Sequence, residues 1–372
     1  MLSMLVALAM SVLADATPLT YTAPNNGIAQ GSHCSTFGHL YEGSEDATLW
    51  RAGLAFVSSG LMPSKTQGGL ILLANLTGAV PAVTPVPIYA EKNFSAYGFR
   101  PHGLHLDNSS SKLYAVSHSD QLQEESIFVF DILSKGTLKL PALKFRYLLT
   151  SPHFEYYPRK MLWYLNDVAV VDGASELYVT QLGPLDFSPA TFKLNKALWR
   201  CTWEEDKAGA DGRLAADCTH AVPTLFLGLN GIAIDPHGTS LLVNDEFGGS
   251  QGASRLVTYR RNQTDGQLTA RESMGLNGSS IDNVELDAGS RDLTMGQYAN
   301  RHQTSKDAGV LVKALPVQPA APTRYKPARV MGAAALPGNV TFQVSSALRY
   351  GEWTLLGSPW DRGPFFCRQM RL

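Results

Sequence analysis

Charged side chains are scarce in this sequence. Asp, Glu, Lys and Arg make up 17% of the 372 residues, the formal net charge at pH 7 is −1, and no five consecutive residues carry the same charge. Nucleic-acid binders neutralise phosphates with clustered Lys and Arg, so the composition argues against a nucleic-acid partner. No later segment approaches the roughly eighteen apolar residues of a membrane-spanning helix. The sequence also lacks a phosphate-binding glycine loop, a Cys-x-x-Cys pair and a His-Glu-x-x-His helix.

The N-terminus and the cysteines indicate the compartment. Residues 1–16 are mostly apolar and end in Ala14-Asp15-Ala16, the small-x-small form of a signal-peptidase site. A basic n-region is missing, and a buried N-terminal strand is the alternative. An even number of cysteines suits an oxidising compartment, and six Asn-x-Ser/Thr sequons suit a secretory route. We therefore predict a secreted or secretory-pathway lumenal protein with candidate glycosylation sites at Asn75, Asn93, Asn108, Asn262, Asn277 and Asn339.

A repeat organises the rest of the chain. Segments starting at 103, 167, 231 and 283 each join two stretches rich in Val, Ile and Leu by a turn of Asp, Gly, Ser, Pro or Asn, which is typical of a β-hairpin. Looser copies start near 53 and 345, and a third strand usually follows each hairpin. Six sheets of this kind arranged radially make a propeller. We predict an all-β, six-bladed β-propeller that occupies residues 17–372 as a single domain.

The residues that open these repeats are polar. The innermost strands of a propeller run along its central channel, so their first residues are expected to meet at one mouth. The openers supply carboxylate and amide oxygens, which Ca²⁺ prefers, whereas Zn²⁺ favours Cys and His. Turn residues that merely cap strand ends are the alternative, but repetition at equivalent positions favours a calcium site. The openers are Glu45-Asp46, His102-Gly103, Asn166-Asp167, Asn230-Gly231 and Asp282-Asn283.

Several of these segments resemble one known family. The sequence is similar to the serum paraoxonase/arylesterase family, calcium-dependent six-bladed propellers that hydrolyse lactones and aryl esters, and more distantly to the SMP-30/gluconolactonase-like propellers. The resemblance runs from Cys34 to Cys367. Its motifs, in order, are GSEDATLWRAGLAFVSSGL (43–61), FRPHGL (99–104), LYAVSHSD (113–120), LNDVAVV (165–171), LNGIAI (229–234) and SIDNVELDAGSRDL (280–293).

This resemblance implies roles for particular residues. It implies a catalytic calcium held by Glu45, Asn166, Asn230, Asp282 and Asn283. It implies a second, structural calcium held by Asp46, Asp167 and the backbone carbonyl of Leu104. The catalytic histidine pair of the family falls on His102 and His118, and its ring-closing disulfide falls on Cys34 and Cys367. Family members often retain the N-terminal segment as a membrane or lipid anchor, so cleavage after Ala16 stays open.

The resemblance also has gaps. The free cysteine of the family is replaced by Gln297, and the loop from Gly183 to Asn195 has little likeness to it. Cys201 and Cys218 have no counterpart and either form a disulfide or remain two buried thiols. These differences affect the channel walls that select a substrate.

Three classes of function follow from these observations. The leading hypothesis is a calcium-dependent hydrolase of small-molecule lactones and aryl esters, in which a histidine pair activates water. The alternative is a propeller enzyme of a natural-product pathway that catalyses a cyclisation, for example of the hetero-Diels-Alder type, in the same channel. A non-enzymatic binding propeller is disfavoured, because a scaffold needs no ring of oxygen ligands. Of the nine histidines, His105 alternates with Leu104 and Leu106 and is expected to pack within its sheet.

Overall fold

The computed structural model of the protein describes most of the predicted repeats. The described residues are 19–22, 33–36, 42–61, 69–90, 94–119, 121–134, 140–154, 165–182, 198–223, 226, 228–246, 248, 254–275, 279–286, 292–299, 310–316, 330–334, 344–362 and 364–368. The candidate signal segment 1–16 and the sequons at Asn93, Asn277 and Asn339 lie outside these ranges. Among the described residues, no helix has the length and apolar character needed to cross a membrane.

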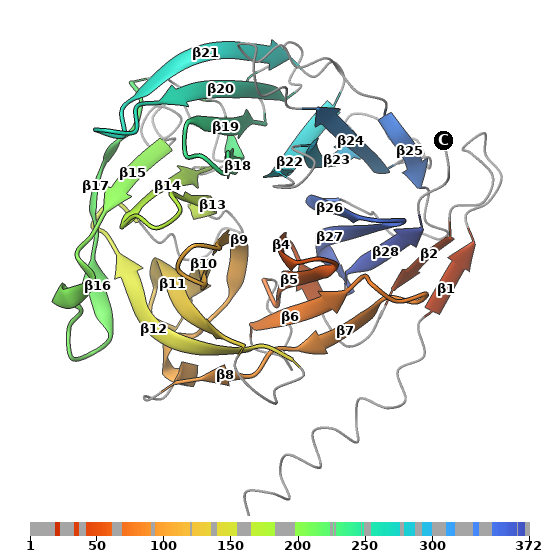
Figure 1. Ribbon diagram of the computed structural model, residues 1–372, viewed down its shortest axis with the longest axis horizontal. Helices are drawn as coiled ribbons and strands as arrows, with labels where there is room; N and C mark the ends of the chain where they lie inside the picture. Colours follow the sequence, from red (N-terminus) through yellow and green to blue (C-terminus); the bar gives the residue numbers. More distant parts are fainter. Residues whose placement is uncertain are drawn as a thin grey trace, which may run out of the picture.

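The described strands form six sheets around a central axis (Figure 1). From the axis outward, the first sheet contains β4 (Ala47–Arg51), β5 (Leu54–Ser59), β6 (Leu70–Asn75) and β7 (Ala82–Pro85). The second contains β9 (Pro101–Asp107), β10 (Lys112–Ser119), β11 (Glu124–Leu133) and β12 (Ala142–Thr150). Two short strands pair in parallel with β12, namely β8 (Ile88–Tyr89) and β16 (Arg213–Ala215).

The next three sheets have four antiparallel strands each. The third contains β13 (Leu165–Val170), β14 (Glu176–Gln181), β15 (Leu198–Thr202) and β17 (Asp217–His220). The fourth contains β18 (Leu229–Ile234), β19 (Ser240–Asp245), β20 (Arg255–Arg261) and β21 (Leu268–Gly275). The fifth contains β22 (Ser279–Leu286), β23 (Asp292–Ala299), β24 (Val310–Pro316) and β25 (Val330–Ala334).

The sixth sheet joins the two ends of the chain. It contains β26 (Ser346–Tyr350), β27 (Trp353–Arg362), β28 (Phe365–Arg368), β2 (His33–Thr36) and β1 (Leu19–Thr22), and β3 (Glu42–Ser44) pairs with β27. The pairing of β2 with β28 places Cys34 opposite Cys367 in register. Two short 3₁₀ helices, η1 (Phe94–Tyr97) and η2 (Glu205–Lys207), lie between strands. The predicted all-β propeller is therefore confirmed as the architecture.

The innermost strands form a closed ring. Each of β4, β9, β13, β18 and β22 contacts the innermost strand of the next sheet, and β26 contacts β4. Hydrophobic clusters fill the spaces between neighbouring sheets; one cluster joins Phe56 and Ile71 of the first sheet to Phe128 and Phe130 of the second. A sheet covered on both faces needs nearly continuous apolar strands, and burying each large side chain contributes about 1.5–3 kcal/mol. This packing explains the Val-, Ile- and Leu-rich repeats.

The cysteines without a family counterpart form a disulfide. Cys201 and Cys218 are register partners on β15 and β17, and their sulfur atoms are bonded. Of the two alternatives that the sequence left open, the structure shows the disulfide rather than two buried thiols. The bond lies within one sheet and closes a loop of 17 residues, whereas the Cys34–Cys367 disulfide remains a prediction.

Candidate active site

The polar openers of four inner strands occupy equivalent β-bulges. In each case two residues of the inner strand lie opposite one residue of its neighbour, so the ladder is interrupted at the same place. Bulges re-aim side chains and are frequent next to active sites. The bulged pairs are His102-Gly103 on β9, Asn166-Asp167 on β13, Asn230-Gly231 on β18 and Asp282-Asn283 on β22. A repeated backbone irregularity thus turns the openers toward one end of the channel.

Two glycines in these bulges allow the inner strands to approach closely. A Cβ atom on Gly103 would lie 2.5 Å from Oδ1 of Asp167, and one on Gly231 would lie 2.5 Å from Cα of Asn283. Both distances are far below any normal contact. Because each glycine faces the polar bulge of the following sheet, glycine is required here by the close packing around the channel.

Glu45 connects two of these bulges at the beginning of β4. Its Oε1 accepts a hydrogen bond from Nδ2 of Asn283 at 2.7 Å and lies 3.3 Å from Nε2 of His102. The side chain is almost fully buried. In the neighbouring bulge, Nδ2 of Asn230 donates to Glu246 at 3.3 Å. Glu45 thus meets Asn283 of the fifth sheet, and Asn230 of the fourth sheet is hydrogen-bonded to Asp282 of the fifth, so predicted ligands from these sheets lie together.

The two predicted catalytic histidines are in direct contact. Nδ1 of His102 lies 2.7 Å from Nε2 of His118, and Nδ1 of His118 lies 2.6 Å from Oε2 of Glu125. Both histidines and Glu125 are buried. Glu45 lies on the other side of His102. Glu45, His102, His118 and Glu125 therefore form a continuous line of contacts that ends in the second sheet.

Asp46, Asp167 and Leu104, the residues predicted to hold a second calcium, form a neighbouring cluster. Oδ2 of Asp46 accepts a hydrogen bond from the backbone N–H of Leu104 at 2.6 Å. The oxygens of Asp167 accept backbone hydrogen bonds from Val168 and Ile232. Both aspartates are buried, and burial raises the pKa of each carboxyl group well above its usual range. In the described part of the chain these carboxylates accept hydrogen bonds from backbone N–H groups, and a bound cation would compensate their negative charge when they are ionised.

Several oxygens at these positions have no hydrogen-bond partner. Buried polar atoms are nearly always paired, so a buried oxygen without a protein partner marks a position suited to a water or an ion. Among the described residues, the buried side-chain oxygens that accept no hydrogen bond include Oε2 of Glu45, Oδ1 of Asp46, and Oδ1 of Asn166, Asn230 and Asn283. Four of these five belong to the predicted catalytic calcium ligands. Carboxylate and amide oxygens in this number fit a Ca²⁺ ion.

The charges in the channel are poorly compensated by protein groups. Burial, together with the charges of neighbouring carboxylates, raises the pKa of Asp46 and Asp282 well above its usual range. Burial and then the charge of Asp167 raise the pKa of Glu285, which lines the channel beyond Asp46. No group of three or more His, Cys, Asp and Glu side chains arranged around a common metal position occurs in the described part of the chain. The predicted catalytic set relies instead on three asparagine amides.

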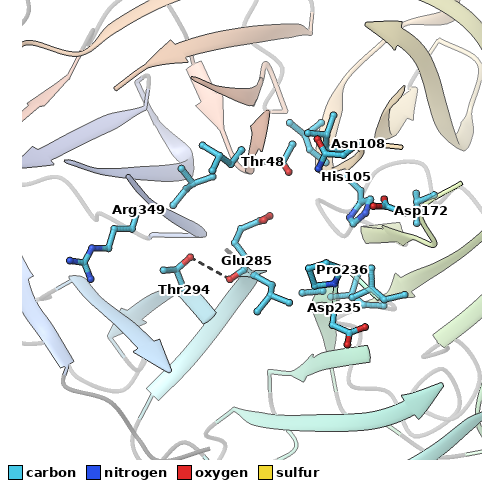
Figure 2. A pocket seen from close by; sticks show the side chains of 18 residues that line it. Thr48, His105, Asn108, Asp172, Asp235, Pro236, Glu285, Thr294 and Arg349 are labelled. Carbon is cyan, nitrogen blue, oxygen red and sulfur yellow. Dashed lines mark hydrogen bonds between the residues drawn. The ribbon is translucent and has the colours of Figure 1, made fainter. Parts of the chain in front are cut away.

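A cavity of about 120 Å³ extends from Leu104, beside the Asp46–Asp167 cluster, along the later residues of the inner strands. Figure 2 shows Thr48, His105 and Glu285 turned toward this space. His105 was predicted to pack within its sheet, and it does so in part: it is half-buried, and burial lowers its pKa to about 4. The residue thus belongs to a different end of the channel from His102.

Sequence reasoning missed Glu125 and Glu246. Glu125 faces His118 because the two residues are register partners in the β10–β11 hairpin. Counting outward from the hairpin turn would have placed them opposite each other. Glu246 follows the last residue of β19, and no motif distinguishes it from an ordinary turn residue.

The comparisons with curated proteins agree with the family resemblance. The chain is 25% identical to human serum paraoxonase/arylesterase 1 over 280 residues, which is 72% of this chain and 70% of the relative. It is 25% identical to human serum paraoxonase/arylesterase 2 over 287 residues, with the same coverage. The solved periplasmic gluconolactonase of Pseudomonas aeruginosa has a TM-score of 0.49 and 14% identity, covering 82% of this chain and 74% of that one. No family model matches the sequence.

The protein is thus an all-β propeller with a buried polar channel. The similarity to the serum paraoxonase/arylesterase family predicted from its motifs is confirmed.

Proposed function

We propose that this protein is a calcium-dependent hydrolase of lactones and aryl esters. The observation that carries the proposal is the group of orphaned, buried oxygens beside a histidine pair at one mouth of the channel. The similarity to human serum paraoxonase/arylesterase 1 supports the same reaction class. Neither a structural scaffold nor a purely apolar binding channel has a need for this arrangement.

Five residues would hold the catalytic calcium: Glu45, Asn166, Asn230, Asp282 and Asn283. A second calcium would be held by Asp46, Asp167 and the carbonyl of Leu104. When bound, the catalytic ion would polarise the ester carbonyl and stabilise the oxyanion that develops on it. The burial of Glu45 and Asn283 keeps bulk water from competing for these ligands.

The histidines would move the proton. Nε2 of His102, which lies 3.3 Å from Oε1 of Glu45, would take a proton from a water molecule, whose oxygen adds to the carbonyl carbon of the ester. The proton then passes to the departing alkoxide, so that ester and water give acid and alcohol. His118 and Glu125 lie behind His102 and would stabilise the positive charge that forms on it.

The architecture and compartment complete the proposal. We take the six sheets to be six blades of one propeller, closed by a disulfide between Cys34 and Cys367. The register of β2 and β28 supports this pairing. The Cys201–Cys218 disulfide supports a secreted or lumenal location, where such bonds persist.

Two substitutions test the proposal, because they distinguish the loss of bound calcium from the loss of the histidine base. His102→Gln should lower lactone turnover by about 10²–10⁴, the range typical of general-base loss, with calcium content unchanged. Asn166→Ala should lower calcium content and activity together. Equal loss of calcium in both variants would contradict the separate roles, and full lactone turnover by His102→Gln would remove the histidine from the mechanism.

A further inference from the structure

The buried carboxylate of Glu125 has no role in the motifs that define the family resemblance. It lies on β11, opposite His118 in register, and its side chain is 3% exposed. Oε2 of Glu125 contacts Nδ1 of His118 at 2.6 Å and accepts the backbone N–H of Leu165 at 3.3 Å. Burying a carboxylate is costly unless hydrogen bonds compensate it. The contacts with His118 and Leu165 therefore stabilise the buried Glu125 side chain.

The contacts determine where protons lie in the histidine pair. We take Glu125 as ionised and both histidines as neutral. An ionised carboxylate only accepts hydrogen bonds, so Nδ1 of His118 then donates to Glu125. Neutral His118 then has a bare Nε2. The 2.7 Å contact with His102 requires one hydrogen, which must come from Nδ1 of His102. His102 is left with a bare Nε2 on its channel side, where a base is needed.

Glu45 favours the opposite arrangement. It lies next to Nε2 of His102 and would attract a proton to that atom. Its contact is longer, however, at 3.3 Å against 2.6 Å for Glu125, and its Oε1 already accepts from Asn283. The shorter hydrogen bond therefore selects the tautomer of the pair.

We propose that Glu125 is a positioning residue that fixes the tautomers of His118 and His102 so that Nε2 of His102 is the base. The inference rests on the proposed hydrolytic function. It adds a third member to the histidine pair, comparable to the carboxylate that orients histidine in serine proteases.

The test combines a spectroscopic and a kinetic measurement on calcium-loaded protein. The ¹⁵N spectrum of histidine-labelled wild type, with His118 assigned by the His118→Gln variant, should show His118 protonated at Nδ1. Glu125→Gln keeps the size of the side chain but removes its charge. We expect this variant to shift the His118 signals and to lower kcat for a lactone by about 10- to 100-fold, the range typical of groups that orient a histidine, with KM changed less than twofold. Glu125→Asp should recover part of the loss.

Glu124→Gln provides the matched control. Glu124 neighbours Glu125 on β11, but it pairs with Arg213 away from the histidines, so its variant should retain wild-type kcat. Melting temperature and bound calcium are measured for each protein to detect misfolding. A wild-type His118 with a bare Nδ1 would overturn the proposal, as would a folded Glu125→Gln variant with unchanged kcat. The wild-type spectrum needs no substrate, so it decides the tautomer even if no lactone is hydrolysed.

Discussion

Removal of the proposed calcium ions should destabilise this protein strongly. Without a cation, five buried oxygens lack partners, on Glu45, Asp46, Asn166, Asn230 and Asn283. Each unsatisfied buried group costs about 1–3 kcal/mol, so together they cost roughly 5–15 kcal/mol, as much as the stability of many whole domains. Water that enters the channel reduces this cost, so the lower end is the appropriate expectation.

The expected shift follows from the size of the chain. For a domain this large, 1 kcal/mol changes the melting temperature by about 2 °C, so chelation should lower it by at least about 10 °C. Scanning calorimetry in EGTA, compared with millimolar calcium, measures the change. Magnesium added in place of calcium is the control, because Mg²⁺ demands a tighter octahedral site and should restore little. An unchanged melting temperature in EGTA would refute the reasoning.

The remaining predictions concern individual residues. Asp46→Ala should lower the melting temperature more than Glu45→Ala, and Glu45→Ala should lower activity more; calorimetry and kinetics that give the reverse order would mean that the two calcium sites are exchanged. Burial alone would raise the pKa of Glu176, but hydrogen bonds from two arginines and a tyrosine lower it to about 2. Its stabilisation is therefore present above the unfolded pKa of about 4.5 and is lost as pH falls toward 2. Glu176→Gln should cost about 3 kcal/mol at pH 7, and urea titration should show the difference shrinking below pH 4.5. Non-reducing peptide mapping should recover Cys34 linked to Cys367, and a link from either to another cysteine would disprove ring closure.

The repeats were predictable because their physical cause is local. Hydrophobic strands and polar turns recur along the sequence, and each polar pair such as Asn166-Asp167 stands at a fixed place near the start of its repeat. The bulges that aim these pairs were not predictable, because they depend on pairing with the next strand. Gly103 and Gly231 belong to the same motifs, yet only the packed ring shows what they approach.

Other features depended on tertiary structure. Spacing alone does not determine cysteine connectivity, so the Cys201–Cys218 bond required the register of β15 and β17. Glu125 was missed because glutamates near a turn, such as Glu124 and Glu125, usually face solvent. Its contact with His118 arises from hairpin register, and its burial arises from the third sheet, whose Leu165 N–H it accepts.

Hydrolysis by calcium-loaded wild type tests the central claim most directly. Phenyl acetate and a series of lactones of different ring size should be hydrolysed in the presence of calcium. The rate should fall to background in excess EGTA and return when calcium is restored. No turnover of any lactone or aryl ester by the calcium-loaded, folded protein would contradict the account, and the channel would then have to serve a different reaction, such as the cyclisation considered from the sequence.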